Sequence, residues 1–324
     1  MEIKESVIKA IENILPELLP DCDIKRLPVI CSPDEFRRRL KEADSDSVII
    51  LADHILEQKN EFLQGIANIT VSEIAARIKN TDVLYAVMDN SLAKTYPSVA
   101  TGSAVIFWDR TRAEQYTSAY NKDKDGKLAA VKLEKEEISD FFMTMTRFGI
   151  EFVSVEPTLC KIRYKQCQLI KTEFDSVSAP SVNFTMLRFL QLQGKNEDPR
   201  VMRILEGAML SAIANATLAC MGITLNGNFE ALLITDKRDG SKWIPCFTDT
   251  TEIQETYTTI PAIAKLMMTS QVVTVAFNEL ERYLSLENVA GVVMNIGGFG
   301  MRLDKRTCQK MIEAKKRKSR GGQQ

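Results

Sequence analysis

The sequence of 324 residues predicts an α+β protein built from two tandem units, each a mixed sheet covered by helices. Three observations support this fold class. Short apolar runs of strand length alternate with segments of helical period. The order strand–strand–helix–strand–helix–strand–strand occurs in both halves. A helix-rich segment at 180–220 lies between the halves as a helical hairpin. The length suits two domains of roughly 150 residues each.

The region 1–80 is expected to be helical. Residues 2–19 place apolar side chains at helical spacing, and Pro16 is expected to kink or break this helix. A second helix should begin after Ser32, because a proline suits the first turn of a helix. Residues 55–80 again have a helical period.

The region 81–170 is expected to form the first sheet unit. Asp109 should cap a helix, because its carboxylate can accept hydrogen bonds from free backbone N–H groups. Strands are predicted at 83–88, 103–108, 128–133, 150–155 and 159–164, and helices at 109–120 and 134–147.

The region 171–225 is expected to form the helical hairpin. Asp198 followed by Pro199 marks a helix start, and this helix is predicted to end at Gly222. The region 226–303 should form the second sheet unit. Its predicted strands are 230–235, 242–248, 271–276, 292–296 and 301–303, and its helices are 249–257, 261–268 and 277–286.

Local matches between the halves predict an internal duplication. Phe107-Trp108-Asp109 aligns with Phe247-Thr248-Asp249 at an offset of 140 residues. Gly149 and Gly291 each lead into an apolar strand. We therefore expect the two units to share one topology, with Asp109 and Asp249 at equivalent helix starts.

The charge of the chain is unevenly distributed. The net charge is −1, but the segment 304–324 carries eight bases and two acids, hence +6. This segment is predicted to be a helix to about Lys316, followed by a basic disordered tail. A nucleic-acid or anionic-membrane contact would be made by this tail. A merely solubilising terminus is the alternative.

Composition predicts a cytoplasmic protein. No apolar run approaches the roughly 18 residues of a membrane-spanning helix. Acidic residues near the N-terminus argue against a signal peptide. The seven cysteines are scattered and odd in number, which suits reduced thiols.

Three segments of the second half resemble the SseB (enhanced serine sensitivity) family domain: 242–249, 275–280 and 291–298. That family typically shows a Pro-x-Phe-Thr-plus-acid segment and a strand that ends in Asn-Pro-Gly, whereas Ile296 stands here in place of the proline. The resemblance covers about residues 198–303, and 83–165 fits as a divergent tandem copy. It implies a bacterial protein of unknown biochemical activity.

Common catalytic devices are not found in the sequence. The single histidine, His54, sits at the start of a predicted helix without a flanking motif, and a surface or capping role is favoured. Cys160 and Cys167 lack a second pair, so no metal site is predicted. Residues 121–126 begin like a calcium loop, but Lys132 occupies the position that requires glutamate, and a polar turn is preferred.

The glycines at 297–300 do not complete a nucleotide-binding fingerprint, and no phosphate loop follows. We interpret them as a tight hairpin with positive φ. No catalytic residue, cofactor or metal site is therefore predicted.

The sequence thus favours a noncatalytic protein-interaction or regulatory module with an unidentified protein partner. A small-molecule (amino-acid) sensor or an enzyme, with a cleft between the repeats, is the alternative. Sheet-edge loops suit docking of a partner, and aromatic residues are enriched at interfaces. The candidate interface residues are Trp243, Pro245, Phe247, Asp249, Asn295, Gly297, Gly298 and Phe299.

Overall fold

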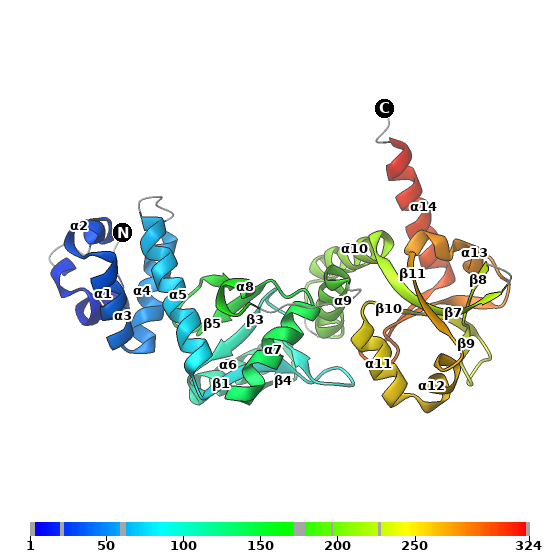
Figure 1. Ribbon diagram of the computed structural model, residues 1–324, viewed down its shortest axis with the longest axis horizontal. Coiled ribbons are helices and arrows are strands. Elements are labelled where there is room, and N and C mark those ends of the chain that lie inside the picture. Colours follow the sequence, from blue (N-terminus) through cyan, green and yellow to red (C-terminus); the bar gives the residue numbers. More distant parts are fainter. Residues whose placement is uncertain are drawn as a thin grey trace. The chain divides into compact units, whose positions relative to one another are not determined.

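The computed structural model describes residues 4–19, 23–58, 63–171, 179–195, 197–225 and 228–321. Helices and two mixed sheets make up the described chain, which confirms the α+β class (Figure 1). No helix in these ranges is long and apolar enough to cross a membrane.

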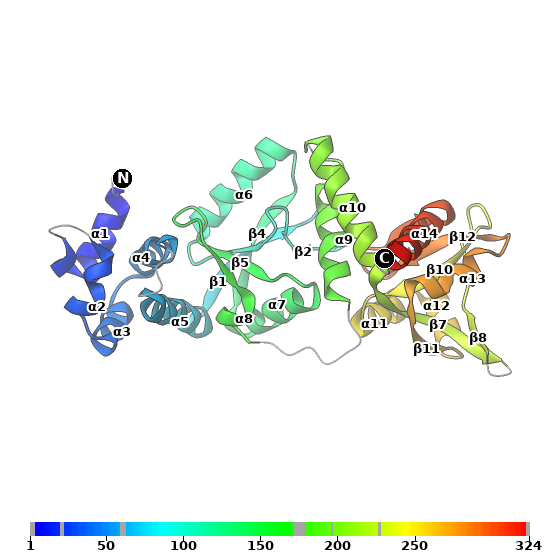
Figure 2. The same cartoon turned by 90° about the horizontal axis from the view of Figure 1, so that it is seen from above.

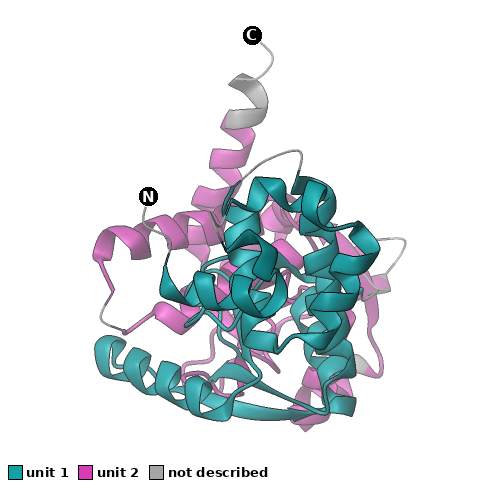
Figure 3. Cartoon of the chain, turned by 90° about the vertical axis from the view of Figure 1, so that its left-hand side faces the viewer, with its two compact units in different colours: residues 1–89, 97–146, 150–173 teal, residues 90–96, 147–149, 174–324 magenta. Residues whose placement is uncertain are grey.

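The chain divides into two compact units (Figure 3). Unit 1 comprises Met1–Asp89, Pro97–Thr146 and Ile150–Glu173. Unit 2 comprises Asn90–Tyr96, Arg147–Gly149 and Phe174–Gln324. Two short segments from the first half of the sequence therefore belong to unit 2.

Unit 1 begins with helices, as the sequence predicts. The first helix stops before Pro16, and a short 3-10 turn follows. The Ser32 side chain caps the helix that starts at Pro33, by accepting a hydrogen bond from the Glu35 N–H at 3.3 Å. The helices are α1 (Glu5–Ile14), η1 (Pro16–Leu18), η2 (Ile24–Arg26), α2 (Leu27–Ile30), α3 (Pro33–Glu42), α4 (Ser45–Glu57) and α5 (Gln64–Asn80).

The sheet of unit 1 has the order β2-β1-β3-β5-β6, with β4 paired to β1. Within it β3 and β5 are parallel, and β1 is antiparallel to both β3 and β4. Its strands are β1 (Val83–Asp89), β2 (Tyr96–Pro97), β3 (Ala104–Phe107), β4 (Leu128–Glu134), β5 (Phe152–Val155) and β6 (Arg163–Lys165). The helices beside them are α6 (Arg110–Lys124), α7 (Lys135–Arg147) and α8 (Gln166–Leu169).

Unit 2 contains the helical hairpin and the second sheet, whose order is β11-β7-β10-β12-β13 with β8 on β7 and β9 on β10. Figure 1 shows α11 and α12 below this sheet and α13 and α14 above it. Its elements are α9 (Pro180–Leu192), α10 (Pro199–Asn215), β7 (Thr217–Leu225), β8 (Asn228–Ala231), β9 (Ile234–Thr235), β10 (Lys242–Phe247), α11 (Thr250–Thr259), α12 (Pro261–Met267), β11 (Gln271–Ala276), η4 (Phe277–Leu280), α13 (Glu281–Leu284), β12 (Val289–Met294), β13 (Met301–Asp304) and α14 (Lys305–Gly321).

Two predicted elements need correction. The helix expected to reach Gly222 ends at Asn215, and the residues that follow form the central strand β7. Residues 218–222 are buried, and such a continuous apolar run cannot be told from a helix by periodicity. The strand predicted at 230–235 is instead the two short strands β8 and β9, so β7 is the counterpart of β1.

The basic segment after Lys316 also differs from expectation. Helix α14 continues to Gly321 instead of giving way to a disordered tail at about Lys316. Lysine and arginine are good helix formers, and bases at a helix C-terminus interact favourably with its dipole. Residues 322–324 of the predicted tail lie outside the described residues.

The two units share one topology. The orders β4-β1-β3-β5-β6 and β11-β7-β10-β12-β13 correspond strand by strand, and each contains a central parallel pair, β3/β5 and β10/β12. Asp109 accepts a hydrogen bond from the Arg112 N–H at 2.7 Å, and Asp249 accepts one from the Glu252 N–H at 2.9 Å. The two aspartates therefore cap equivalent helices, as the duplication predicts.

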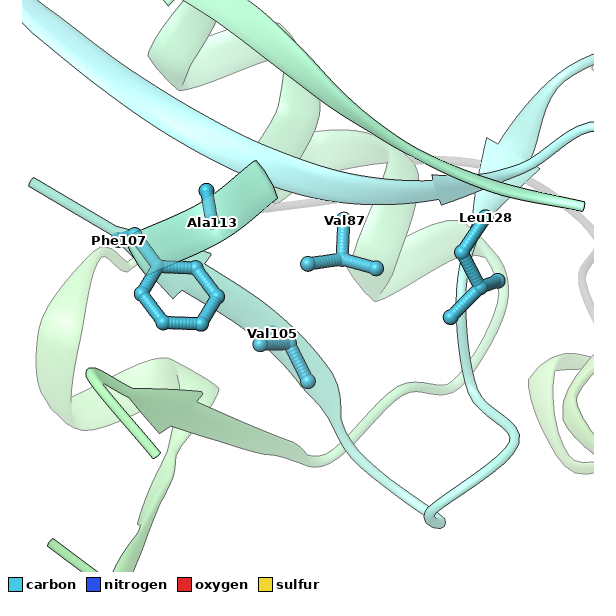
Figure 4. Packing of buried hydrophobic residues seen from close by; sticks show 5 residues of the cluster. All are labelled: Val87, Val105, Phe107, Ala113 and Leu128. Carbon is cyan, nitrogen blue, oxygen red and sulfur yellow. The ribbon is translucent and has the colours of Figure 1, made fainter. Parts of the chain in front are cut away.

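The equivalent strands also bury equivalent aromatic residues. In unit 1, Phe107 lies in a cluster of buried side chains from β1, β3, α6 and β4 (Figure 4), which contains Val87, Val105, Phe107, Ala113 and Leu128. In unit 2, Phe247 packs with Ala219 and Met221 of β7. Each phenylalanine precedes its capping aspartate by two residues.

Candidate functional site

Most of the predicted interface residues lie toward the carboxyl ends of β10 and β12, whereas Trp243 lies near the start of β10, and most of the eight are covered. Trp243, Gly297 and Gly298 are half-buried. The remaining five are buried: Pro245, Phe247, Asp249, Asn295 and Phe299. Only the indole and the two glycines are therefore accessible as contact surface.

Phe299 is a packing residue and is only 4 % exposed. Its ring centroid lies 5.6 Å from that of Tyr96, edge to face, and 5.7 Å from that of Phe148. All three residues belong to unit 2. Such contacts stabilise a core, so replacement of Phe299 would disturb folding rather than an exposed surface.

Asn295 joins the ends of the two parallel strands. Its backbone has φ of 47°, in the left-handed region that asparagine tolerates. Its N–H donates to the Cys246 carbonyl at 2.9 Å, and its side-chain oxygen accepts from the Thr248 N–H at 3.0 Å. The strand-end segment that resembles the family motif thus holds the start of α11.

A buried charge cluster lies directly beside this joint. The Arg147 guanidinium contacts three carboxylates of unit 2: Asp249 at 3.2 Å, Glu252 at 2.5 Å and Glu255 at 3.3 Å. Lys94 approaches Glu255 at 2.6 Å. Sequence reasoning did not find Arg147, because it lies 102 residues before Asp249 and carries no local motif.

The cluster contains two cations, Arg147 and Lys94, and three carboxylates, so the negative charge is not fully neutralised. The Glu252 side chain is fully buried, and one carboxylate oxygen has no hydrogen-bond partner among the described residues. Burial, with the nearby charges of Glu255 and Asp249, raises the pKa of Glu252 to about 8, although Arg147 opposes the rise. Glu252 therefore retains its proton to a higher pH than an exposed glutamate does.

The glycines that follow Asn295 are explained by close approach. Neither Gly297 nor Gly298 has positive φ, contrary to the prediction from sequence. A Cβ on Gly297 would lie 2.5 Å from the Thr256 Cα, and one on Gly298 would lie 2.2 Å from Glu252 Oε2. Glycine is required here because the loop packs directly against α11.

Trp243 lines a cavity of about 350 Å³ in unit 2, which we call the Trp243 cavity. Its apolar walls come from β9, β10, α12 and β12, and its polar residues are Thr235, Asp236, Lys237 and Arg302. The Arg302 guanidinium carbon lies 5.0 Å from the centroid of the Trp243 ring. This arrangement is a cation–π contact at the cavity wall.

A larger apolar groove of about 650 Å³ lies in unit 1, which we call the α3–α5 groove. Helices α3 and α5 lie side by side in both views (Figures 1 and 2). The groove residues are Leu27, Pro28 and Cys31 of the α2 region; Pro33, Phe36, Arg37, Leu40 and Lys41 of α3; and Gly65, Ile66, Asn68, Ile69, Ser72, Glu73 and Ala76 of α5. The helical periods were visible in the sequence, but the pairing of α3 with α5 was not.

The residues weighed for catalysis are dispersed. His54 lies in the last turn of α4 rather than at a helix start, and its half-burial lowers its pKa. No group of three or more histidine, cysteine or acidic residues in the described chain could hold a metal ion. Asn121 lies within α6, where its side chain hydrogen-bonds the backbone of Leu128 at 2.8 and 2.9 Å.

Comparison with known proteins adds no assignment. No family model, no curated protein and no solved structure matches this chain.

Proposed function

We propose that this chain is a noncatalytic protein-interaction module, and that the α3–α5 groove binds an amphipathic helix with acidic residues along one flank. The observation that carries the proposal is the groove itself, with its apolar floor, its open rim and its unbalanced positive charge.

The shape of the groove fits a helix. Gly65, Ile69, Ser72 and Ala76 recur every three or four residues, so they form one face of α5. They extend over 12 residues, or about 16 Å along the helix axis, which equals roughly three turns of a partner helix. Three of these four side chains, at Gly65, Ser72 and Ala76, are small and leave room, and a Cβ added to Gly65 would have nothing within 4 Å.

The charge of the rim favours an acidic partner. Arg37 and Lys41 lie one turn apart on α3 and are exposed, and Arg37 already bonds Asp34 at 2.7 Å. Lys41 has no ion-pair partner among the described residues, whereas Glu73 on the opposite side is already bonded to Arg77 at 2.9 Å. The uncompensated charge at the rim is therefore positive, and acidic side chains would be steered to it.

The apolar surface continues past the end of the groove. Val29 follows the groove residue Pro28 in α2 and is 89 % exposed. A large apolar side chain beside an open apolar groove supports partner binding more than it supports a closed catalytic pocket.

We also propose a cytoplasmic location, in keeping with an SseB-like bacterial protein. The support is the state of the thiols: the cysteines in the described ranges are unpaired, and all except Cys167 are buried. Buried, unpaired cysteines suit a reducing compartment.

Two labelled helical peptides would test the groove by fluorescence anisotropy. Both carry leucines at positions i, i+4, i+7 and i+11; one has glutamates on the flank and the other has lysines. We expect the full-length protein to bind the glutamate peptide, and Ser72→Phe to weaken binding by about tenfold or more because the new ring fills the groove. Lys79→Phe, at the exposed end of the same helix, is the matched control.

Reversal of the charge at the groove rim gives a second test of the proposal. Lys41→Glu should lower affinity for the glutamate peptide and raise it for the lysine peptide, whereas Lys79→Glu should do neither. The proposal fails if the wild-type protein binds neither peptide or both equally, or if Ser72→Phe and Lys79→Phe bind the glutamate peptide alike.

A further inference from the structure

We propose that the Trp243 cavity binds a small organic anion, namely a monocarboxylate with a compact aromatic or branched aliphatic body. This site lies within unit 2 and does not depend on the α3–α5 groove. Its volume of about 350 Å³ falls within the range of ligand cavities. Since a water molecule in the liquid takes up roughly 30 Å³, a cavity of this volume has room for a ligand of about a dozen non-hydrogen atoms.

The walls select an apolar body. The branched side chains of four isoleucines line the cavity: Ile234, Ile260, Ile263 and Ile296. The indole of Trp243 supplies a flat wall, and its N–H already donates to the Ser241 hydroxyl at 2.8 Å. Because this donor is satisfied within the protein, a ligand meets the ring as an apolar and polarisable surface.

The lining charges select an anion. Arg302 uses Nη1 for its bond to Asp236, at 2.7 Å, and its other guanidinium nitrogens have no hydrogen-bond partner among the described residues. Its side chain is 45 % exposed. Lys237 is exposed as well and has no ion-pair partner in the described chain. Two cations with free donors therefore lie on one apolar cavity.

Asp236 does not attract a cationic ligand to the cavity, because its carboxylate is already bonded to two arginines. Arg238 bonds both of its oxygens, through Nε at 3.1 Å and Nη2 at 2.7 Å, and Arg302 bonds one of them. These bonds, with the Arg238 N–H, hold the pKa of Asp236 well below its usual range. Asp236 thus acts as a positioning residue that holds Arg302 over the indole, where the remaining N–H groups can bind a carboxylate.

The chain provides its own reporter for this site. It contains two tryptophans, so Trp108→Phe leaves Trp243 as the single indole. In this background we would titrate phenylacetate, 3-phenylpropionate and 4-methylpentanoate, with phenylacetamide as the neutral match to the first. We expect a saturable change in emission, with phenylacetate bound at least about tenfold more tightly than phenylacetamide.

Variants separate a carboxylate site from a general apolar patch. Arg302→Gln should weaken phenylacetate binding by about tenfold or more, and Ala262→Phe should abolish it by filling the cavity. Arg238→Gln is the matched control, because Arg238 also bonds Asp236 but does not line the cavity. Titration calorimetry repeats each measurement without the fluorescence reporter, and circular dichroism verifies folding.

Three results would overturn the proposal. They are the absence of saturable binding by all three carboxylates at millimolar concentration, equal affinity for phenylacetate and phenylacetamide, and equal loss of binding in Arg302→Gln and Arg238→Gln. None of these results would bear on the α3–α5 groove, whose peptide assay measures unit 1.

Discussion

Replacement of Glu252 by glutamine is expected to remove a pH-dependent loss of stability in unit 2. In the folded protein the pKa of Glu252 is raised from 4.5 to about 8, chiefly by burial. Between these two values the folded state retains a proton that the unfolded state releases. Rising pH therefore destabilises the fold across this window, and below pH 4.5 the effect is absent.

The magnitude follows from the same two values. Each pH unit within the window costs about 1.4 kcal/mol of unfolding free energy, so the whole window amounts to at most about 5 kcal/mol. Glutamine keeps a carbonyl oxygen for Arg147, which lies 2.5 Å from the carboxylate, and it never ionises. Near pH 5 the variant and the wild type should differ by less than about 1 kcal/mol, and near pH 9 the variant should be more stable by several kcal/mol.

The assay is urea unfolding at a series of pH values from 5 to 9, followed by Trp243 emission in the Trp108→Phe background so that unit 2 is observed. Glu255→Gln is the matched control on the same helix, because it contacts the same guanidinium at 3.3 Å but leaves Glu252 in place. It should retain the slope over a narrower window. If wild type and Glu252→Gln show the same slope between pH 5 and 8, Glu252 is ionised in the fold and the reasoning fails.

Three further experiments test this cluster and the packing of other parts of the chain. Arg147→Met leaves buried Asp249 and Glu252 without their shared cation and should cost about 3–5 kcal/mol of unfolding free energy in urea at pH 7; a cost below about 1 kcal/mol would contradict the role given to Arg147. Gly298→Ala should lower the unfolding free energy by about 1–3 kcal/mol, because its Cβ would lie 2.2 Å from Glu252 Oε2. Gly65→Ala should instead stabilise α5 by about 0.5–1 kcal/mol, because its Cβ would meet nothing within 4 Å. Thermal melts in which Gly65→Ala is the less stable variant would refute the packing argument. Native labelling with iodoacetamide, followed by mass spectrometry, should modify Cys167 before the buried thiols of Cys160 and Cys308, whose pKa is raised by burial to about 12; faster reaction at either buried thiol would exclude this order.

The parts of the fold that the sequence predicts are those determined by neighbours in the chain. The caps formed by Asp109, Asp249 and Ser32 act on N–H groups three residues away, so their signal is local. Strand β7 lacks such a signal. Its central residues are buried in a run that suits a helix equally well, and pairing with β8, β10 and β11 decides its conformation.

The site was harder to predict because its residues meet from distant parts of the chain. Sequence patterns identified Asp249, Asn295 and the glycines, which lie at strand ends and helix starts. They did not identify Arg147, whose partners lie more than 100 residues away. They also left the exposure of Phe299 undecided, because burial of this ring depends on Tyr96 and Phe148.

The two copies reach the same geometry with different charges. In unit 1 the left-handed residue at the strand end is Glu156, with φ of 48°, and its carboxylate accepts from the Trp108 N–H at 2.7 Å, as Asn295 accepts from Thr248. Three residues after the capping aspartate, unit 1 carries Arg112, which bonds Glu156 at 3.1 Å.

Unit 2 carries an acid, Glu252, at that same position, next to a neutral asparagine, so the cation must come from elsewhere, and Arg147 supplies it. A buried acid beside the strand end requires a cation within reach, whichever position provides it. The copies therefore differ in how these charges are balanced, and they remain alike in topology and helix caps, which do not depend on the sign of those charges.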